Sequence, residues 1–139
     1  MKKRRKWLAL ILSAVILFVG MSPLAEASTT ASIQPMFINL SSISASMSAN
    51  GNILNVGVDI SGISGTTNIS LTTTLQRRPS GGSFSDVTSW NDSTNSSSLL
   101  ATHSYYATSG YYYRIKVAAK VTRNGIVENV TTNSNECYI

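Results

Sequence analysis

Cysteine and histidine each occur only once in this 139-residue chain, as Cys137 and His103, and this scarcity excludes most familiar site chemistry. A single cysteine cannot form an intrachain disulfide bond. A lone histidine cannot supply the several ligands with which proteins hold zinc. No Gly-x-Ser-x-Gly motif is present to place a serine nucleophile beside it. We therefore expect no catalytic residue, no cofactor and no metal ion.

Positive charge is also scarce once the N-terminal segment is set aside. Residues 2–6 hold five of the eleven lysine and arginine side chains, and residues 7–21 follow without a charge. This order, ending at the small residues Ala25 and Ala27, is typical of a secretory signal peptide cleaved before Ser28. The 112 residues that follow carry six cations and five anions, so most of the formal net charge of +5 belongs to the signal. No nucleic-acid partner is expected, because phosphate binding needs a basic patch on the folded domain.

Long hydrophobic runs are absent too. The uncharged stretch 7–21 is shorter than the roughly 18 residues expected of a membrane-spanning helix. Residues 28–36 are polar and contain Pro35, which predicts a flexible leader before one domain at residues 37–139. We expect a secreted or loosely surface-associated protein that meets the membrane only through its signal peptide, before cleavage.

Apolar residues of that domain recur at every second position, which is the pattern of half-buried β-strands. The pattern is clear in residues 43–47, 54–60 and 69–75 and weaker in 83–90 and 97–106. It is strongest in residues 111–122. There one face holds Tyr111, Tyr113, Ile115, Val117, Ala119 and Val121, and the other holds Tyr112, Arg114, Lys116, Ala118, Lys120 and Thr122.

Turn residues separate these segments. Asn-Gly pairs in residues 49–52 and 123–125 suit tight hairpins, and residues 77–82 and 107–110 are further turns. Serine and threonine make up 35 of residues 28–139, and the persistent alternation places them on solvent faces of strands. About seven strands with short turns predict an all-β fold, an antiparallel immunoglobulin-like or fibronectin type III-like β-sandwich.

The segment YYRIKVAAKV resembles the Tyr-x-Val-x-Val-x-Ala signature of strand F in fibronectin type III and related immunoglobulin-like domains. Tyr113, Ile115, Val117 and Ala119 occupy the signature positions. The resemblance implies that Tyr113 forms a tyrosine corner, with its hydroxyl bonded to upstream backbone near residues 107–110. The tryptophan and the cysteine pair of those families are missing, so the strand order stays open.

A second resemblance covers nearly the whole chain. The signal peptide, IQPMFINLSSISASMS, LTTTLQRR with FSDVTSW, and YYYRIKVAAKV are together similar to a group of small secreted proteins of Gram-positive bacteria. That group is described as a domain of unknown function. The resemblance implies an extracellular setting and transfers no catalytic residue.

The best candidate for a binding surface is a basic strand face. It comprises Tyr112, Arg114, Lys116 and Lys120, joined by Arg77 and Arg78 if the strands at 69–75 and 111–122 are neighbours. Such a face suits an anionic cell-wall polymer, a glycan or another surface protein. The alternative is an ordinary solvated sheet face. We expect a non-catalytic binding or adhesion module.

Trp90, flanked by Asp86 and Asp92, suggests a weaker alternative. An exposed ring with nearby carboxylates is suited to stacking on a sugar, as in a carbohydrate-active module. Alternatively, Trp90 packs at the edge of the core while the two acids serve turns. The oxygen-rich residues 92–98 lack the paired carboxylates of a calcium loop.

The lone cysteine and the strand edges leave a further alternative, a structural protein that self-associates. Cys137 could link two chains, or it could be a small buried residue of the last strand, facing the same way as Ile139. A Cys–His pair would require Cys137 and His103 to meet from different predicted strands. Exposed strand edges could also pair between chains.

Overall fold

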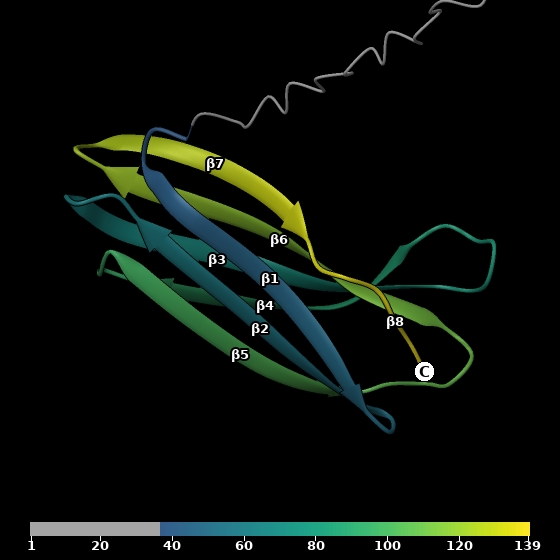
Figure 1. Ribbon diagram of the computed structural model, residues 1–139. Helices are drawn as coiled ribbons and strands as arrows, with labels where there is room; N and C mark the ends of the chain where they lie inside the picture. The colour runs from purple at the N-terminus through teal and green to yellow at the C-terminus, as the bar shows by residue number, and fades with distance from the viewer. Residues whose placement is uncertain (1–36) are drawn as a thin grey trace, which may run out of the picture. The chain divides into compact units, whose positions relative to one another are not determined.

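The computed structural model describes residues 37–139, which form two antiparallel β-sheets packed against each other, with no helix in that range (Figure 1). The predicted signal peptide, its cleavage between Ala27 and Ser28, and the leader at 28–36 lie outside the described residues. Within residues 37–139 no helix is long and apolar enough to cross a membrane. The prediction of an all-β sandwich is confirmed.

The small sheet has three strands in the order β1-β2-β5. Their bounds are Leu40–Asn50, Ile53–Gly62 and Ser98–Tyr106. The large sheet has the order β4-β3-β6-β7, and the short β8 also pairs with β6. Its strands are β3 (Thr66–Arg78), β4 (Ser85–Thr94), β6 (Tyr112–Arg123), β7 (Ile126–Asn133) and β8 (Cys137–Tyr138). The neighbouring positions of β3 and β6 decide which polar residues share a face.

Two hairpins form at the Asn-Gly pairs that the sequence marks as turns. Gly51 joins β1 to β2 with φ of 57°, and Asn124 and Gly125 join β6 to β7 with φ of 51° and 76°. These left-handed conformations match the right-handed twist of the flanking strands and favour glycine and asparagine. The predicted hairpin chemistry is confirmed at both turns.

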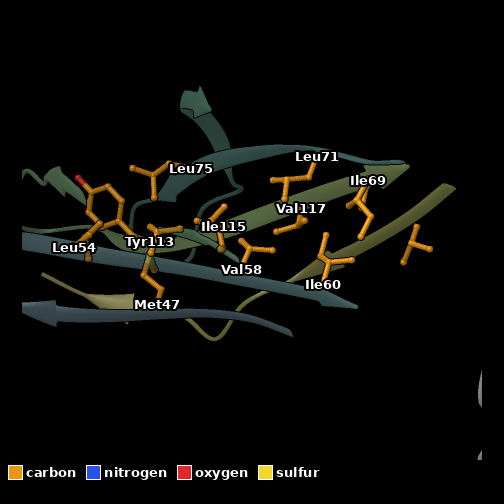
Figure 2. Close-up of a cluster of buried hydrophobic side chains, with 14 of the residues drawn as sticks. Met47, Leu54, Val58, Ile60, Ile69, Leu71, Leu75, Tyr113, Ile115 and Val117 are labelled. Atoms are coloured by element: carbon orange, nitrogen blue, oxygen red, sulfur yellow. The ribbon is translucent and has the colours of Figure 1, made fainter. Parts of the chain in front are cut away.

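The core lies between the sheets and is built from the alternating apolar positions (Figure 2). Leu54, Ile60, Ile69 and Ile115 are fully buried. Their β-branched or branched side chains suit a pleated sheet with one buried face. The outward positions between them carry mainly serine, threonine and asparagine, which explains the abundance of hydroxyl side chains.

Tyr113 is a buried corner residue at the start of β6. Its side chain is fully buried. Its hydroxyl donates a hydrogen bond to the Thr108 carbonyl oxygen and accepts one from the Thr108 backbone N–H, each at 3.0 Å. The tyrosine-corner geometry expected from the resemblance is present, and it ties the 107–110 turn to the large sheet.

The side of the sandwich where β1 lies near β7 and β8 is covered by side chains. Asn135 accepts a hydrogen bond from the Met47 backbone N–H and donates one to the Met47 carbonyl oxygen, as a neighbouring strand would. The Glu128 carboxylate accepts hydrogen bonds from the backbone N–H groups of Ile38, Asn39 and Leu40. The contacts to Leu40 and Met47 occupy backbone groups at the free edge of β1, and those to Ile38 and Asn39 hold the segment just before it.

Candidate functional site

The outer face of the large sheet places two lysines among small polar side chains. Lys116, Ala118 and Lys120 are exposed, outward positions of β6. The other positions in the same three cross-strand rows are all hydroxyl or amide side chains: Ser70, Thr72, Thr74, Ser89, Asn91, Ser93, Asn129, Thr131 and Asn133. We call these twelve residues the lysine face.

A depression of about 550 Å³ hollows the lysine face. Its lining includes Lys120 and Ala118 from β6, Thr72 from β3, Asn91 from β4 and Thr131 from β7. Ala118 and its neighbours have short side chains, so the surface here lies closer to the backbone of the sheet than it does around the lysine side chains. A hydroxyl-bearing or anionic group can therefore approach the sheet closely between side chains that donate and accept hydrogen bonds.

The two lysines of the face carry uncompensated charge. The ion pairs formed within residues 37–139 join Arg78 to Glu136 and His103 to Asp92, and neither includes Lys116 or Lys120. Four residues along a strand span about 13 Å. As far as residues 37–139 show, the lysine face therefore offers two ammonium groups outside any ion pair, spaced along one strand.

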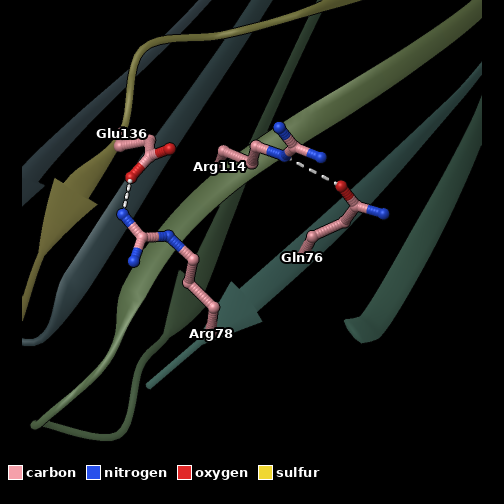
Figure 3. A network of polar contacts seen from close by, with 4 residues as sticks. All are labelled: Gln76, Arg78, Arg114 and Glu136. Carbon is pink, nitrogen blue, oxygen red and sulfur yellow. Dashed lines mark hydrogen bonds and ion pairs between the residues drawn. The ribbon is translucent and has the colours of Figure 1, made fainter. Parts of the chain in front are cut away.

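The arginine end of the predicted basic face is internally paired (Figure 3). Arg114 donates from Nε to the Gln76 side-chain oxygen at 3.0 Å, and Gln76 donates in turn to the Asp86 carboxylate at 2.7 Å. The Arg114 guanidinium also lies 3.9 Å from the centre of the Phe84 ring. Arg114 therefore braces β6 against β3 and β4, and the structure brings Asp86 into this network.

Arg78 is engaged in the same way beside β8. Its Nη2 lies 2.8 Å from a carboxylate oxygen of Glu136, and its guanidinium lies 4.4 Å from the centre of the Tyr112 ring. Tyr112 also contacts Tyr138, with ring centres 4.9 Å apart. Tyr112 and Arg78 thus share the predicted face, where they hold the C-terminal segment to the sheet.

Arg77 does not lie on this face, which corrects the expectation that both arginines of the pair would join it. Neighbouring residues of a strand point to opposite faces, so Arg77 turns away from Arg78. It stands opposite the inward-facing Tyr113, and its guanidinium lies 4.6 Å from the centre of the Tyr111 ring.

Trp90 also points away from the predicted binding face and packs against the core from the edge strand β4. Its ring stacks on His103 of β5, with centres 4.8 Å apart and planes 5° apart. His103 Nε2 lies 2.8 Å from an Asp92 carboxylate oxygen. Asp86 lies on the other face with Gln76, so the sandwich separates the two carboxylates of the proposed sugar platform. The structure thus favours the alternative in which Trp90 packs at the core edge.

Cys137 and His103 occupy different parts of the sandwich. Cys137 is half-buried, packs against the core and lies with its sulfur 3.4 Å from the Met47 carbonyl oxygen. His103 contacts Trp90 and Asp92 on the opposite side. Within residues 37–139 no three His, Cys, Asp or Glu side chains come close enough to hold a metal ion.

Sequence reasoning missed the hydroxyl and amide residues of the lysine face. Thr72, Asn91 and Thr131 lie in one row with Ala118. Their outward positions follow from alternation along each strand. That they lie side by side across the sheet depends on the register between strands, and the sequence alone does not show that register.

Comparisons with known proteins add no relative from which a function could be transferred. No protein-family model matches the chain, and no curated protein matches it significantly.

Proposed function

We propose that this protein is a secreted, non-catalytic binding module whose lysine face holds an anionic, hydroxyl-rich polymer at the cell surface. The observation that carries the proposal is the pair of lysines, Lys116 and Lys120, which form no ion pair within residues 37–139. Lys120 lines the depression together with hydroxyl and amide side chains, and Lys116 stands on the same strand face. Charge complementarity attracts the polymer, and the neutral polar side chains hydrogen-bond its hydroxyl and ester oxygens.

The domain type and the extracellular location are also part of the proposal, and each has its own support. The fibronectin type III-like identity is supported by the Tyr113 corner and by the adjacency of β3 and β6. Extracellular placement is supported by the signal-peptide pattern of residues 1–27 and by the similarity to small secreted proteins of Gram-positive bacteria. We therefore propose a fibronectin type III-like domain that acts outside the cell.

Polymer binding is tested by removing the two free charges. Lys116→Gln/Lys120→Gln should weaken retention on immobilised polyglycerol phosphate about tenfold, because two exposed charged contacts contribute about 0.5–1 kcal/mol each. Retention of the wild-type chain should fall steeply as salt rises from about 0.05 to 0.5 M, since salt screens exposed charges. The measurement is affinity chromatography across a salt series.

The matched control is Arg77→Gln/Arg123→Gln, which removes two cations outside the lysine face. Arg77 lies against Tyr111, and Arg123 donates to the Ser64 carbonyl oxygen. This variant should bind like the wild-type chain. Retention that both double variants lower equally would reduce the effect to net charge, and retention insensitive to salt would remove the lysine face as the binding surface.

A further inference from the structure

The outer edge of β5 differs from the edge of β1 because no side chain of residues 37–139 hydrogen-bonds to its backbone. Among the described strands, β5 pairs only with β2. The strand contains neither lysine nor proline, two residues that commonly protect sheet edges from pairing with another chain. Its free edge therefore remains available to a further strand.

Two backbone hydrogen bonds fix which residues of β5 point to that free edge. The Ala107 N–H donates to the Asn52 carbonyl oxygen, and the Gly62 N–H donates to the Ser97 carbonyl oxygen. Hydrogen-bonded pairs alternate with non-bonded pairs along an antiparallel ladder. Odd-numbered residues of β5 therefore bond to β2. The N–H and C=O groups that face outward belong to Ser98, Leu100, Thr102, Ser104 and Tyr106.

Leu100 and Tyr106 make this edge apolar at two symmetric places. Their side chains are 72% and 75% exposed, the highest values among the large hydrophobic residues of the described chain. Both lie on the outer face of the small sheet, three residues to either side of His103. An antiparallel copy of the same strand centred on His103 therefore places Leu100 of each copy beside Tyr106 of the other.

We propose that two copies of the chain pair through β5, antiparallel and centred on His103. Leu100 then lies opposite Tyr106 of the second copy, and Thr102 lies opposite Ser104 of the second copy. All four are outward-bonding positions, so the hydrogen-bonding pattern and the apolar contacts require the same register. The two small sheets become one continuous sheet.

The centre of the symmetric pair is compatible with this register. The two-fold axis passes between the two copies of His103, which stand opposite each other as a non-bonded pair, so the backbone groups of His103 remain bonded to β2. Its imidazole points between the sheets, where it stacks on Trp90 and pairs with Asp92. The ring thus leaves the outer face, where Leu100 and Tyr106 meet, uncovered.

Sedimentation velocity of the chain from Ser28 onward tests the dimer. All strand pairings of the described domain lie within residues 37–139, so this form keeps the complete sandwich. We expect a concentration-dependent dimer that persists with reductant. A monomer at every concentration up to about 1 mM would overturn the proposal, because the dissociation constant of the dimer would then lie well above that concentration and the dimer would be scarcely populated. A dimer lost with reductant would instead be a Cys137 bridge and would also overturn it.

Two variants test the edge directly. Thr102→Pro removes an outward N–H from each copy without removing a bond to β2, and should weaken dimerisation about 30-fold. Leu100→Lys/Tyr106→Lys places like charges opposite each other and should abolish the dimer. Because Leu100→Lys/Tyr106→Lys changes only exposed side chains, it tests the edge even if Thr102→Pro disturbs the fold. The control Ile126→Lys/Val127→Lys changes two exposed apolar residues of β7 and should dimerise normally. Dimers that survive both edge variants, or that fail equally in the control, would contradict β5 pairing.

Cross-linking identifies the register. In a Cys137→Ser background, chains with Thr102→Cys mixed with chains with Ser104→Cys should form a heterodimeric disulfide. Each variant alone should cross-link much less. Efficient linking of Thr102→Cys chains to one another would contradict the centre at His103.

Discussion

At the scale of single residues, Glu128 fixes the start of β1 through three hydrogen bonds from backbone N–H groups to its carboxylate. Burial of its carboxyl works to raise its pKa, but hydrogen bonds from the backbone N–H groups of Ile38, Asn39 and Leu40 outweigh this and leave the pKa lowered. A carboxylate with a lowered folded-state pKa stabilises the fold above its unfolded pKa of about 4.3, and this contribution is lost as pH falls through the folded-state value.

Replacing Glu128 tests this residue-scale account. Glu128→Gln should lower the free energy of unfolding by about 1 kcal/mol at pH 7, because a partly exposed charged acceptor is replaced by a neutral one. The difference from the wild-type chain should shrink at pH 3, where the carboxylate is being protonated. Urea unfolding at both pH values measures it.

Glu136→Gln is the matched control for that measurement, because Glu136 makes only a partly exposed ion pair with Arg78. Its effect should stay below about 0.5 kcal/mol. Equal effects of the two substitutions at pH 7 would show that the backbone hydrogen bonds of Glu128 stabilise the fold no more than an exposed ion pair does.

At the scale of strands, the period-two pattern was sufficient to locate β1, β2, β3 and β6. β2, β3 and β6 alternate between a buried apolar face and a more exposed face, and β1 alternates in the same way with a face that is partly half-buried. That contrast is what the pattern detects. β4 and β5 were less clear because polar residues interrupt their inward faces, Thr88 and Asp92 in β4 and His103 in β5. In β4 a bulge also interrupts the pairing with β3 between Leu75 and Gln76. The bulge leaves Val87 as an extra residue and shifts the alternation by one position before Trp90.

Only the residues of the candidate site that lie on one strand could be predicted from the sequence. Lys116 and Lys120 follow from alternation along β6, whereas their partners depend on pairing with β3 and β7. Arg77 was assigned wrongly because the pair was treated as one unit, although adjacent residues of a strand face opposite ways. The side-chain pairing that engages Arg114 and Arg78 comes from Gln76 and Glu136, which are distant in sequence.

The Tyr113 corner gives a prediction at this same scale, since it joins a turn to a strand. Tyr113→Phe should lower the free energy of unfolding by about 1–3 kcal/mol, because it removes two part-buried hydrogen bonds to the backbone of Thr108, each worth about 0.5–1.5 kcal/mol. Tyr112→Phe, on the solvent face, should change it by less than about 0.5 kcal/mol. Thermal and urea unfolding of the two variants measure the contrast. Equal stability of Tyr113→Phe and wild type would show that the corner does not hold β6.

At the scale of the whole molecule, the two proposals use different parts of the sandwich. The lysine face lies on the outside of the large sheet, whereas the free edge of β5 belongs to the small sheet. A two-fold axis perpendicular to the joined small sheets turns both lysine faces to the same side. A dimer of this kind presents two binding faces to one polymer, and the linked contacts raise the overall affinity without any new residue contact.

The most direct test of the central claim is to map where the polymer contacts the folded chain. Backbone amide NMR shifts of the chain from Ser28 onward should be followed as soluble polyglycerol phosphate is added. The lysine face predicts the largest changes at residues 70–74, 89–93, 116–120 and 129–133, with little change at His103 or the outer face of the small sheet. Changes centred on His103 and the rest of β5, or binding that leaves residues 116–120 unperturbed, would contradict the account.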